Sequence, residues 1–159
     1  MKTLEMIKGT YPIIKKEFSK DECNKILREA IEESEKIHGD EPVFQSKASQ
    51  GFMEQGIFGI SIYKALIKRM KHEETCIFTQ KCFLHNVDIM FKSPILRCFS
   101  KSKTLLRISR KIIIKDANSK DNSLGFKYEL KSKKKEYLYE FDVLQCPIVQ
   151  LLKNMIYYF

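Results

Sequence analysis

Cysteine and histidine are the side chains of this sequence best suited to nucleophilic chemistry. Cys146 precedes Pro147 and follows an alternating run that predicts a β-strand, so we expect it where a strand turns into a helix. Amides at a helix N-terminus stabilise the thiolate, which is the nucleophilic form. A base such as His72 or His85 would have to lie nearby in space. We therefore name Cys146 as the candidate nucleophile and His85 as its candidate base. The alternative is that Cys146 fills the strand–helix corner as an apolar residue.

A metal site is the second chemistry that these residue types allow. The spacing Cys76-x5-Cys82-x2-His85 contains three possible ligands, whereas zinc sites use tighter pairs and four ligands. The sequence has five cysteines, which are Cys23, Cys76, Cys82, Cys98 and Cys146. None of them belongs to a C-x-x-C pair. The N-terminus has no apolar segment of the kind that export signals carry, so we expect reduced thiols. We favour burial of these cysteines as small apolar residues over metal binding.

Positive charge is concentrated in the second half of the chain. Residues 81–159 carry 16 Lys and Arg against 7 Asp and Glu, whereas residues 1–80 carry 13 of each. This asymmetry indicates an anionic partner, and the candidate anion-binding residues are Lys103, Arg107, Arg110 and Lys111 within the basic segment 101–115. The alternative, which we favour from the sequence alone, is a solvated helix face of the kind found in lysine-rich proteins.

Length and composition restrict the class of protein but name no reaction. A chain of 159 residues with 43% apolar residues can bury a core without disulfides or metal, and we expect a single domain, residues 1–159. No stretch approaches the roughly 20 apolar residues of a membrane span, so we expect a cytoplasmic protein with no membrane contact. The common nucleotide-binding, metalloprotease and serine-hydrolase motifs are absent, and no cofactor is implied.

About four helices are predicted in the first two thirds of the chain. Ser19 and Glu22 form a capping-box pattern before a helix that ends near Gly39, and residues 39–55 are predicted as a loop. Further helices are predicted over residues 56–71, from His72 to Phe91, and from Ser93 to Ile114. The triplet 112–114 is also compatible with a strand because it is β-branched. Residues 116–123 are predicted as a loop.

The hydrophobic period changes to two after residue 125. Alternating runs around 126–131 and 137–143, joined by residues 132–136, predict an antiparallel hairpin, and 148–156 predicts a short helix. We therefore predict an α+β fold in which N-terminal helices pack on a β-hairpin that is followed by a short C-terminal helix. Because exposed hairpin edges are prone to pair, the hairpin or the aromatic segment 157–159 could form a homo-oligomer contact.

Several segments resemble the bacterial L-2-amino-thiazoline-4-carboxylic acid hydrolase-like family. The strand over residues 139–143 leading into Cys146, Pro147 and Ile148 resembles that family's F-x-V/I-T-x-C-P segment. Residues 59–66 resemble its G-x-x-L-Y-x-x-L helix, and the early segment 11–19 and the helix after Glu73 and Glu74 also fit. The resemblance implies hydrolytic opening of a thiazoline ring in a small-molecule substrate, with Cys146 matching the family's Cys-Pro cysteine. The later motifs of the family have no counterpart here, which implies a C-terminally truncated and inactive member.

Two other functions are compatible with the sequence. One is a non-enzymatic module that binds a small ligand, or a polyanion or nucleic acid, through the basic segment 101–115, with Tyr128 or Tyr137 available for stacking. No recognised nucleic-acid-binding motif supports a nucleic-acid partner. The other is a helical sensor or ligand-binding domain that dimerises.

Overall fold

The computed structural model describes residues 2–40, 44–94, 101–120, 126–130, 141–146 and 148–149. These residues group into two compact units, which are described separately below. The first comprises Met1–Glu41 and Glu54–Ser93, and the second comprises Pro42–Met53 and Pro94–Phe159. The expectation of a single domain stays a prediction.

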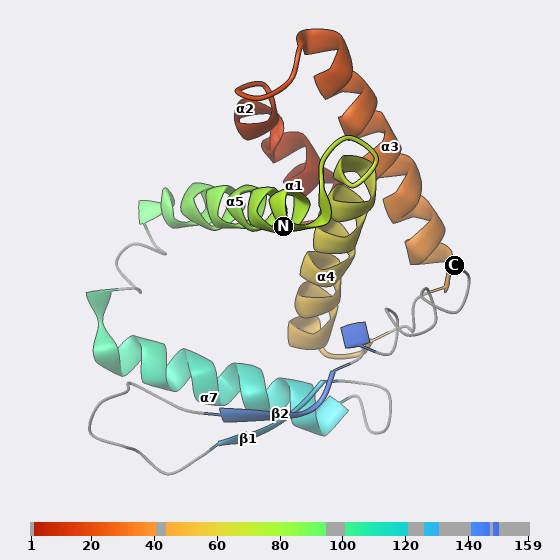
Figure 1. Ribbon diagram of the computed structural model, residues 1–159. Helices are drawn as coiled ribbons and strands as arrows, with labels where there is room; N and C mark the ends of the chain where they lie inside the picture. The colour runs from red at the N-terminus through yellow and green to blue at the C-terminus, as the bar shows by residue number, and fades with distance from the viewer. Residues whose placement is uncertain are drawn as a thin grey trace. The chain divides into compact units, whose positions relative to one another are not determined.

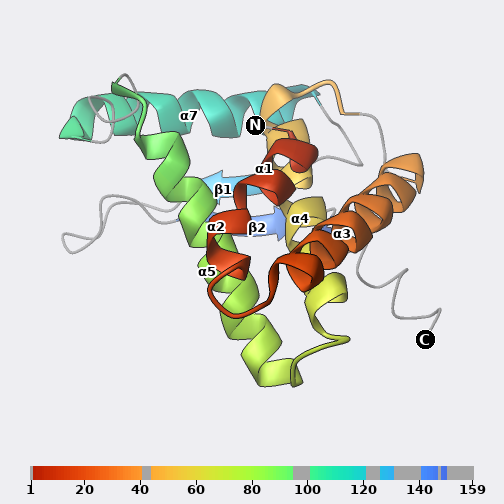
Figure 2. The ribbon, with the colours of Figure 1, turned by 90° about the horizontal axis from the view of Figure 1, so that it is seen from above.

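The first unit is built from helices alone within the described residues. It contains α1 (Thr3–Gly9), α2 (Tyr11–Ile14), α3 (Lys20–Asp40), α5 (His72–Phe91) and the C-terminal part of α4 (Lys47–Leu66). The short helices α1 and α2 both contact α3, and α2 also contacts α5. Figure 2 shows α1 and α2 lying between the two long helices α3 and α5. The residues before α3, which the sequence leaves ambiguous, therefore form two short helices.

Local capping explains where two of these helices begin. The Glu22 amide donates to Ser19 Oγ at 3.3 Å, as the capping-box pattern predicts. The Glu22 carboxylate, however, accepts a hydrogen bond from Arg69 instead of reaching back to the cap. At the start of α5, the Lys71 amide donates to Glu74 Oε2 at 3.3 Å, which places a carboxylate at the positive end of the helix dipole.

The core of the first unit is made by the apolar faces of these helices. Its fully buried side chains include Ile7, Ile14, Cys23, Ile26, Phe58, Ile62, Leu66 and Cys82. Burying one large aliphatic or aromatic side chain stabilises a fold by about 1.5–3 kcal/mol. Phe18 and Phe78 add an edge-on ring contact with centroids 6.1 Å apart.

The close approach of α1 to α5 depends on Asn86 and Gly9. The buried Asn86 Nδ2 donates to the Met6 carbonyl at 3.1 Å and to the Cys82 carbonyl at 3.2 Å. A Cβ at Gly9 would lie 2.7 Å from Asn86 Oδ1, which is closer than such atoms pack. Glycine is therefore needed here for space, and Asn86 ties the end of α1 to α5.

We expect Gly9→Ala to lower the free energy of unfolding by about 1–2 kcal/mol, because Asn86 must move and weaken two buried hydrogen bonds. Chemical denaturation followed by circular dichroism measures the change. Gly59→Ala in α4 is the matched control, since a Cβ there has no atom within 4 Å. It should stabilise the helix by about 0.5–1 kcal/mol. Equal effects of the two substitutions would contradict the steric role of Gly9.

Arg69, just after α4, links this part of the chain to α3. Its Nη2 donates to Glu29 Oε1 at 2.8 Å, its Nη1 donates to Glu29 Oε2 at 3.0 Å, and its Nε binds Glu22. The Arg69 side chain is 11% exposed. The hydrogen bonds from Arg69 lower the pKa of Glu29 to about 2. The ion pair between Arg69 and Glu29 therefore stabilises the fold only while Glu29 is ionised.

This lowered pKa predicts an acid-dependent loss of stability. The contribution of Glu29 is fully present above about pH 5 and is lost as the pH falls towards 2, since the unfolded state binds the proton more readily. We expect Glu29→Gln to be less stable than the parent at pH 7 and to lose less stability between pH 5 and pH 2. Urea titrations across this range measure both effects. Glu32→Gln, an exposed carboxylate on α3, is the control and should leave the pH profile unchanged.

The second unit combines helix and strand. It contains α7 (Lys103–Lys120), the first residues of α4, β1 (Lys127–Leu130) and β2 (Phe141–Gln145). The strands pair antiparallel, with Tyr128 opposite Val143 and an irregularity between Lys127 and Tyr128. Figure 1 shows α7 running beside both strands, and α7 contacts β1 directly. Asn118 on α7 exchanges hydrogen bonds with the backbone of Tyr128 at 2.8 and 2.9 Å.

Aromatic packing and one carboxylate hold the second unit together. Phe52 packs against Phe126 and Tyr128, with ring centroids 5.4 and 5.8 Å apart. Ser46 Oγ donates to Asp116 Oδ2 at 2.8 Å, and Ser46 in turn accepts from the Ser49 amide at 3.1 Å. Asp116 thus attaches α7 to the start of α4.

The predicted α+β fold, with helices packed on a hairpin, is wrong. The described chain is mainly helical, and its strands have only four and five residues. A two-stranded sheet is marginal in water and cannot serve as the platform of a fold. The helices of the first unit instead bury their apolar faces against one another, while β1 packs on α7. The expected turn at 132–136 and most of the expected C-terminal helix lie outside the described residues.

Two predicted loops are also wrong in part. The loop predicted over 39–55 contains the first residues of α4, which begins at Lys47, and the loop predicted over 116–123 contains the end of α7, which continues to Lys120. The polar residues there are stabilised by long-range contacts of Asp116 that the sequence does not show. The triplet 112–114 is helical.

Candidate functional site

The basic face of α7 is the charged surface that the described structure defines best. Arg107, Lys111 and Lys115 are exposed and follow one another at four-residue intervals, so they form a row along the helix with a rise of about 6 Å between neighbours. We call these three residues the cation row. The buried residues Ile114 and Ala117 attach the helix to its own unit. The helix therefore presents the row to solvent.

The other predicted anion-binding residues are placed differently. Arg110 is half-buried and lies outside the cation row. Lys103 is the first residue of α7, and its side chain is outside the described part of the structure. Lys101 is exposed just before the helix. Of the predicted set, Arg107 and Lys111 are exposed and share the cation row with Lys115, and their binding of an anion stays a prediction.

Within the described part of the chain, no acidic side chain pairs with the cation row. Asp116 is the one acidic residue of α7, and its carboxylate binds Lys120 Nζ at 2.6 Å as well as Ser46 and the Ala48 amide. These contacts, Lys120 first, lower the pKa of Asp116 to about 2. None of the three row residues forms an ion pair with another described residue. Like charges four residues apart cost a helix about 0.2–0.5 kcal/mol per pair.

An apolar strip lies beside the cation row. Leu105, Ile108 and Ile112 recur at helical spacing, and Ile108 and Ile112 are 50% and 61% exposed. The outward side of α7 therefore combines cations with aliphatic side chains.

Cys146 directly follows β2, and it is half-buried. The Val149 amide donates to the Cys146 carbonyl at 3.0 Å, so the chain turns here, while Pro147 lies outside the described residues. Burial, and to a smaller extent the Cys146 thiolate, raises the pKa of Tyr128 to about 12. Cys146 belongs to the second unit and His85 to the first, so the two candidate catalytic residues share no unit.

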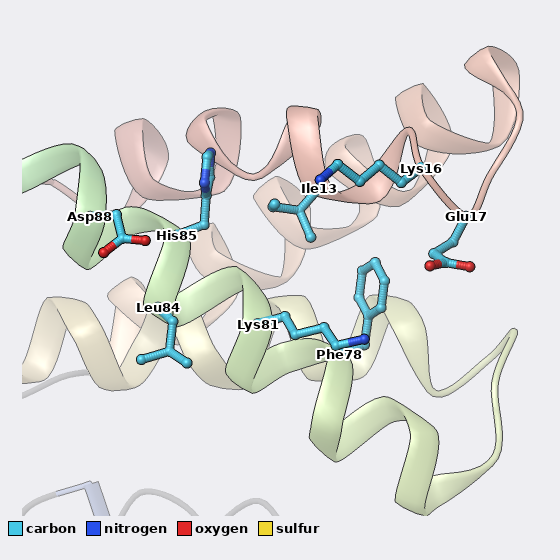
Figure 3. A pocket seen from close by; sticks show the side chains of 8 residues that line it. All are labelled: Ile13, Lys16, Glu17, Phe78, Lys81, Leu84, His85 and Asp88. Carbon is cyan, nitrogen blue, oxygen red and sulfur yellow. The ribbon is translucent and has the colours of Figure 1, made fainter.

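His85 lines a shallow groove of about 400 Å³ in the first unit (Figure 3). The groove has apolar walls from Ile13, Phe78 and Leu84, and its remaining lining residues are Lys16, Glu17, Lys81 and Asp88. His85 Nε2 is buried without a hydrogen-bond partner. Among the described residues, no cysteine, serine or threonine lines the groove, so the groove offers His85 no thiol or hydroxyl group to activate.

The three residues of the possible metal-ligand spacing lie in different environments. Cys82 is fully buried, and burial raises the pKa of its thiol to about 12, whereas Cys76 is exposed. Cys76, Cys82 and His85 therefore do not converge. Within the described residues, no group of three or more Cys, His, Asp or Glu side chains could hold a metal ion.

One chemically notable cluster was not predicted. Cys76 Sγ lies 3.9 Å from His72 Nε2, and His72 Nδ1 is hydrogen-bonded to the Tyr63 hydroxyl at 2.7 Å. The four-residue spacing of His72 and Cys76 places both side chains on one face of a helix, and that spacing is visible in the sequence. Tyr63 is brought to His72 only by the packing of α4 against α5.

Comparison with known proteins finds no matching family model, curated protein or solved structure. The resemblance to the thiazoline hydrolase-like family stays a prediction. Among the described residues, no helix is long and apolar enough to cross a membrane.

Proposed function

We propose that this chain is a binding module for a linear polyanion, which it holds through the cation row of α7. The observation that carries the proposal is the line of Arg107, Lys111 and Lys115 on an exposed helix face, where none of the three pairs with a described acidic residue. A polyanion with regularly spaced phosphate or sulfate groups would contact all three cations and release its bound counterions. The proposal accounts for charges that the fold itself does not need.

The residues predicted for base stacking contribute little to this proposal. Tyr128 packs against Phe52 and stacks on Phe126 within the second unit, and Tyr137 lies outside the described residues. The binding should therefore be governed by charge and show little preference for base sequence.

The predicted hydrolase remains an alternative proposal. It rests on Cys146 and its place after β2, and its substrate would be a small cyclic amidine. No hydrogen bond joins the Cys146 thiol to a described histidine or carboxylate, so no described group acts as its base. We therefore rank polyanion binding first. A cytoplasmic location and a homo-oligomer likewise stay proposals.

Neutralising the cation row tests the proposed function. We expect the triple variant Arg107→Gln/Lys111→Gln/Lys115→Gln to bind a labelled single-stranded DNA of roughly 20 nucleotides about tenfold more weakly at low salt. The slope of log K against log salt should become shallower by about 2, since each phosphate contact on a single strand contributes about 0.7. Fluorescence anisotropy across a salt series measures both quantities, and a heparin fragment in a parallel series distinguishes phosphate from sulfate partners.

A charge-matched variant provides the control. Lys20→Gln/Lys25→Gln/Arg28→Gln removes the same three charges from exposed positions of α3. It should bind within about twofold of the parent if the row is specific. Equal weakening by both triple variants would show that net charge alone drives binding. Absence of binding to either probe at low salt would overturn the proposal.

A further inference from the structure

The cluster of Cys76, His72 and Tyr63 in the first unit has the arrangement of an activated thiol. We propose that Cys76 is a site of reversible S-thiolation, at which a low-molecular-weight disulfide forms a mixed disulfide with the chain. His72 accepts the thiol proton in this reaction, and Tyr63 positions His72. The site lies in the first unit, whereas the cation row lies in the second.

Helix geometry brings the thiol and the imidazole together. His72 is the first residue of α5 and Cys76 lies four residues further, so their side chains share one face of the first turns. Sγ and Nε2 are 3.9 Å apart, which is within the range of a long hydrogen bond to sulfur. The N-terminus of α5 also supports negative charge on the thiolate through the helix dipole.

Tyr63 determines which imidazole nitrogen faces the thiol. Its hydroxyl lies 2.7 Å from His72 Nδ1, and the two rings meet edge to face with centroids 5.9 Å apart. When Nδ1–H donates to the Tyr63 oxygen, the lone pair of Nε2 is free to take the proton of Cys76. Cys76 as nucleophile contacts His72 as base, and His72 is oriented by Tyr63. Other cysteine nucleophiles have the same order of contacts.

The proposed step balances without any further reagent. The Cys76 thiol gives its proton to His72 Nε2, and the thiolate attacks one sulfur of the small disulfide. A new S–S bond forms at Cys76 while the old S–S bond breaks. The electron pair leaves with the departing thiolate, which takes the proton from His72 and departs as a thiol. Cys76 is oxidised and the departing sulfur is reduced, so a free thiol reverses the step.

Exposure distinguishes Cys76 from the other described cysteines. Cys76 and His72 are both exposed, so a small disulfide can approach the sulfur from solvent. Cys23 and Cys82 are fully buried, and burial raises the pKa of both thiols. Cys146 is half-buried and belongs to the second unit. Charges near the cluster are mixed, since Lys71, Glu73 and Glu74 are exposed around it.

The test measures the rate of mixed-disulfide formation at each cysteine of the full-length chain. The folded protein is incubated with glutathione disulfide at neutral pH, the reaction is quenched by acid, and peptide mass spectrometry locates and quantifies the adduct. We expect Cys76 to be modified first. We expect His72→Gln to slow its modification about tenfold, since glutamine keeps the polarity but takes no proton, and Tyr63→Phe to slow it by a smaller factor.

A cysteine moved to another position of α5 distinguishes activation of the thiol by His72 from simple exposure of the thiol to solvent. In Cys76→Ser/Gln80→Cys, the thiol is exposed one turn further along α5 and has no histidine four residues before it. Its modification should be about tenfold slower than that of Cys76 in the parent, similar to Cys76 in His72→Gln. Equal rates for the relocated thiol and Cys76 would refute the proposal, as would faster modification of Cys146, which the hydrolase alternative predicts. Circular dichroism of each variant confirms that the helices are retained.

Discussion

The ion pairs of Arg69 are the interaction on which the arrangement of the first unit depends. This guanidinium lies in the connection between α4 and α5 and binds two carboxylates of α3, Glu22 and Glu29, as well as the Ala65 carbonyl at 2.6 Å. Losing this side chain would leave Glu22 without its cation and Glu29 with Lys68 alone, and breaking such a partly buried pair is destabilising. The connection is therefore held in one conformation, and the first residue of α5 has a defined place next to α4.

The proposed thiol site follows from that constraint. Tyr63 is near the end of α4 and His72 begins α5, so their hydrogen bond forms only if the short segment between them is held in place. Arg69 lies within this segment and is anchored to α3. In the second unit Asp116 has a corresponding role, because it binds Ser46 and the Ala48 amide at the start of α4 while it lies on α7. In each unit one charged side chain with several partners orders the elements around it.

The sequence predicted what local rules determine and missed what distant contacts determine. The helices over 20–38 and 72–91 were predictable because capping residues and apolar periodicity agree there. The end of α7 was not, since Asp116 and Asn118 are typical of a loop until their partners at the start of α4 and in β1 are known. For the sites, the exposed cations of α7 and the spacing of His72 and Cys76 are visible in the sequence. The contact of Tyr63 with His72 is a product of folding.

Both proposed sites are places where the chain departs from what stability alone favours. A helix gains from pairs of opposite charge, yet α7 aligns three cations while its one carboxylate, Asp116, pairs with Lys120 and Ser46. Apolar residues gain from burial, yet Ile108 and Ile112 stay exposed beside those cations. Folding alone also does not require the exposed Cys76 thiol to lie beside His72, whose Nδ1 is already hydrogen-bonded to Tyr63. Such departures are expected where a sequence is constrained by function. The two sites lie in different units, the thiol site in the first and the cation row in the second.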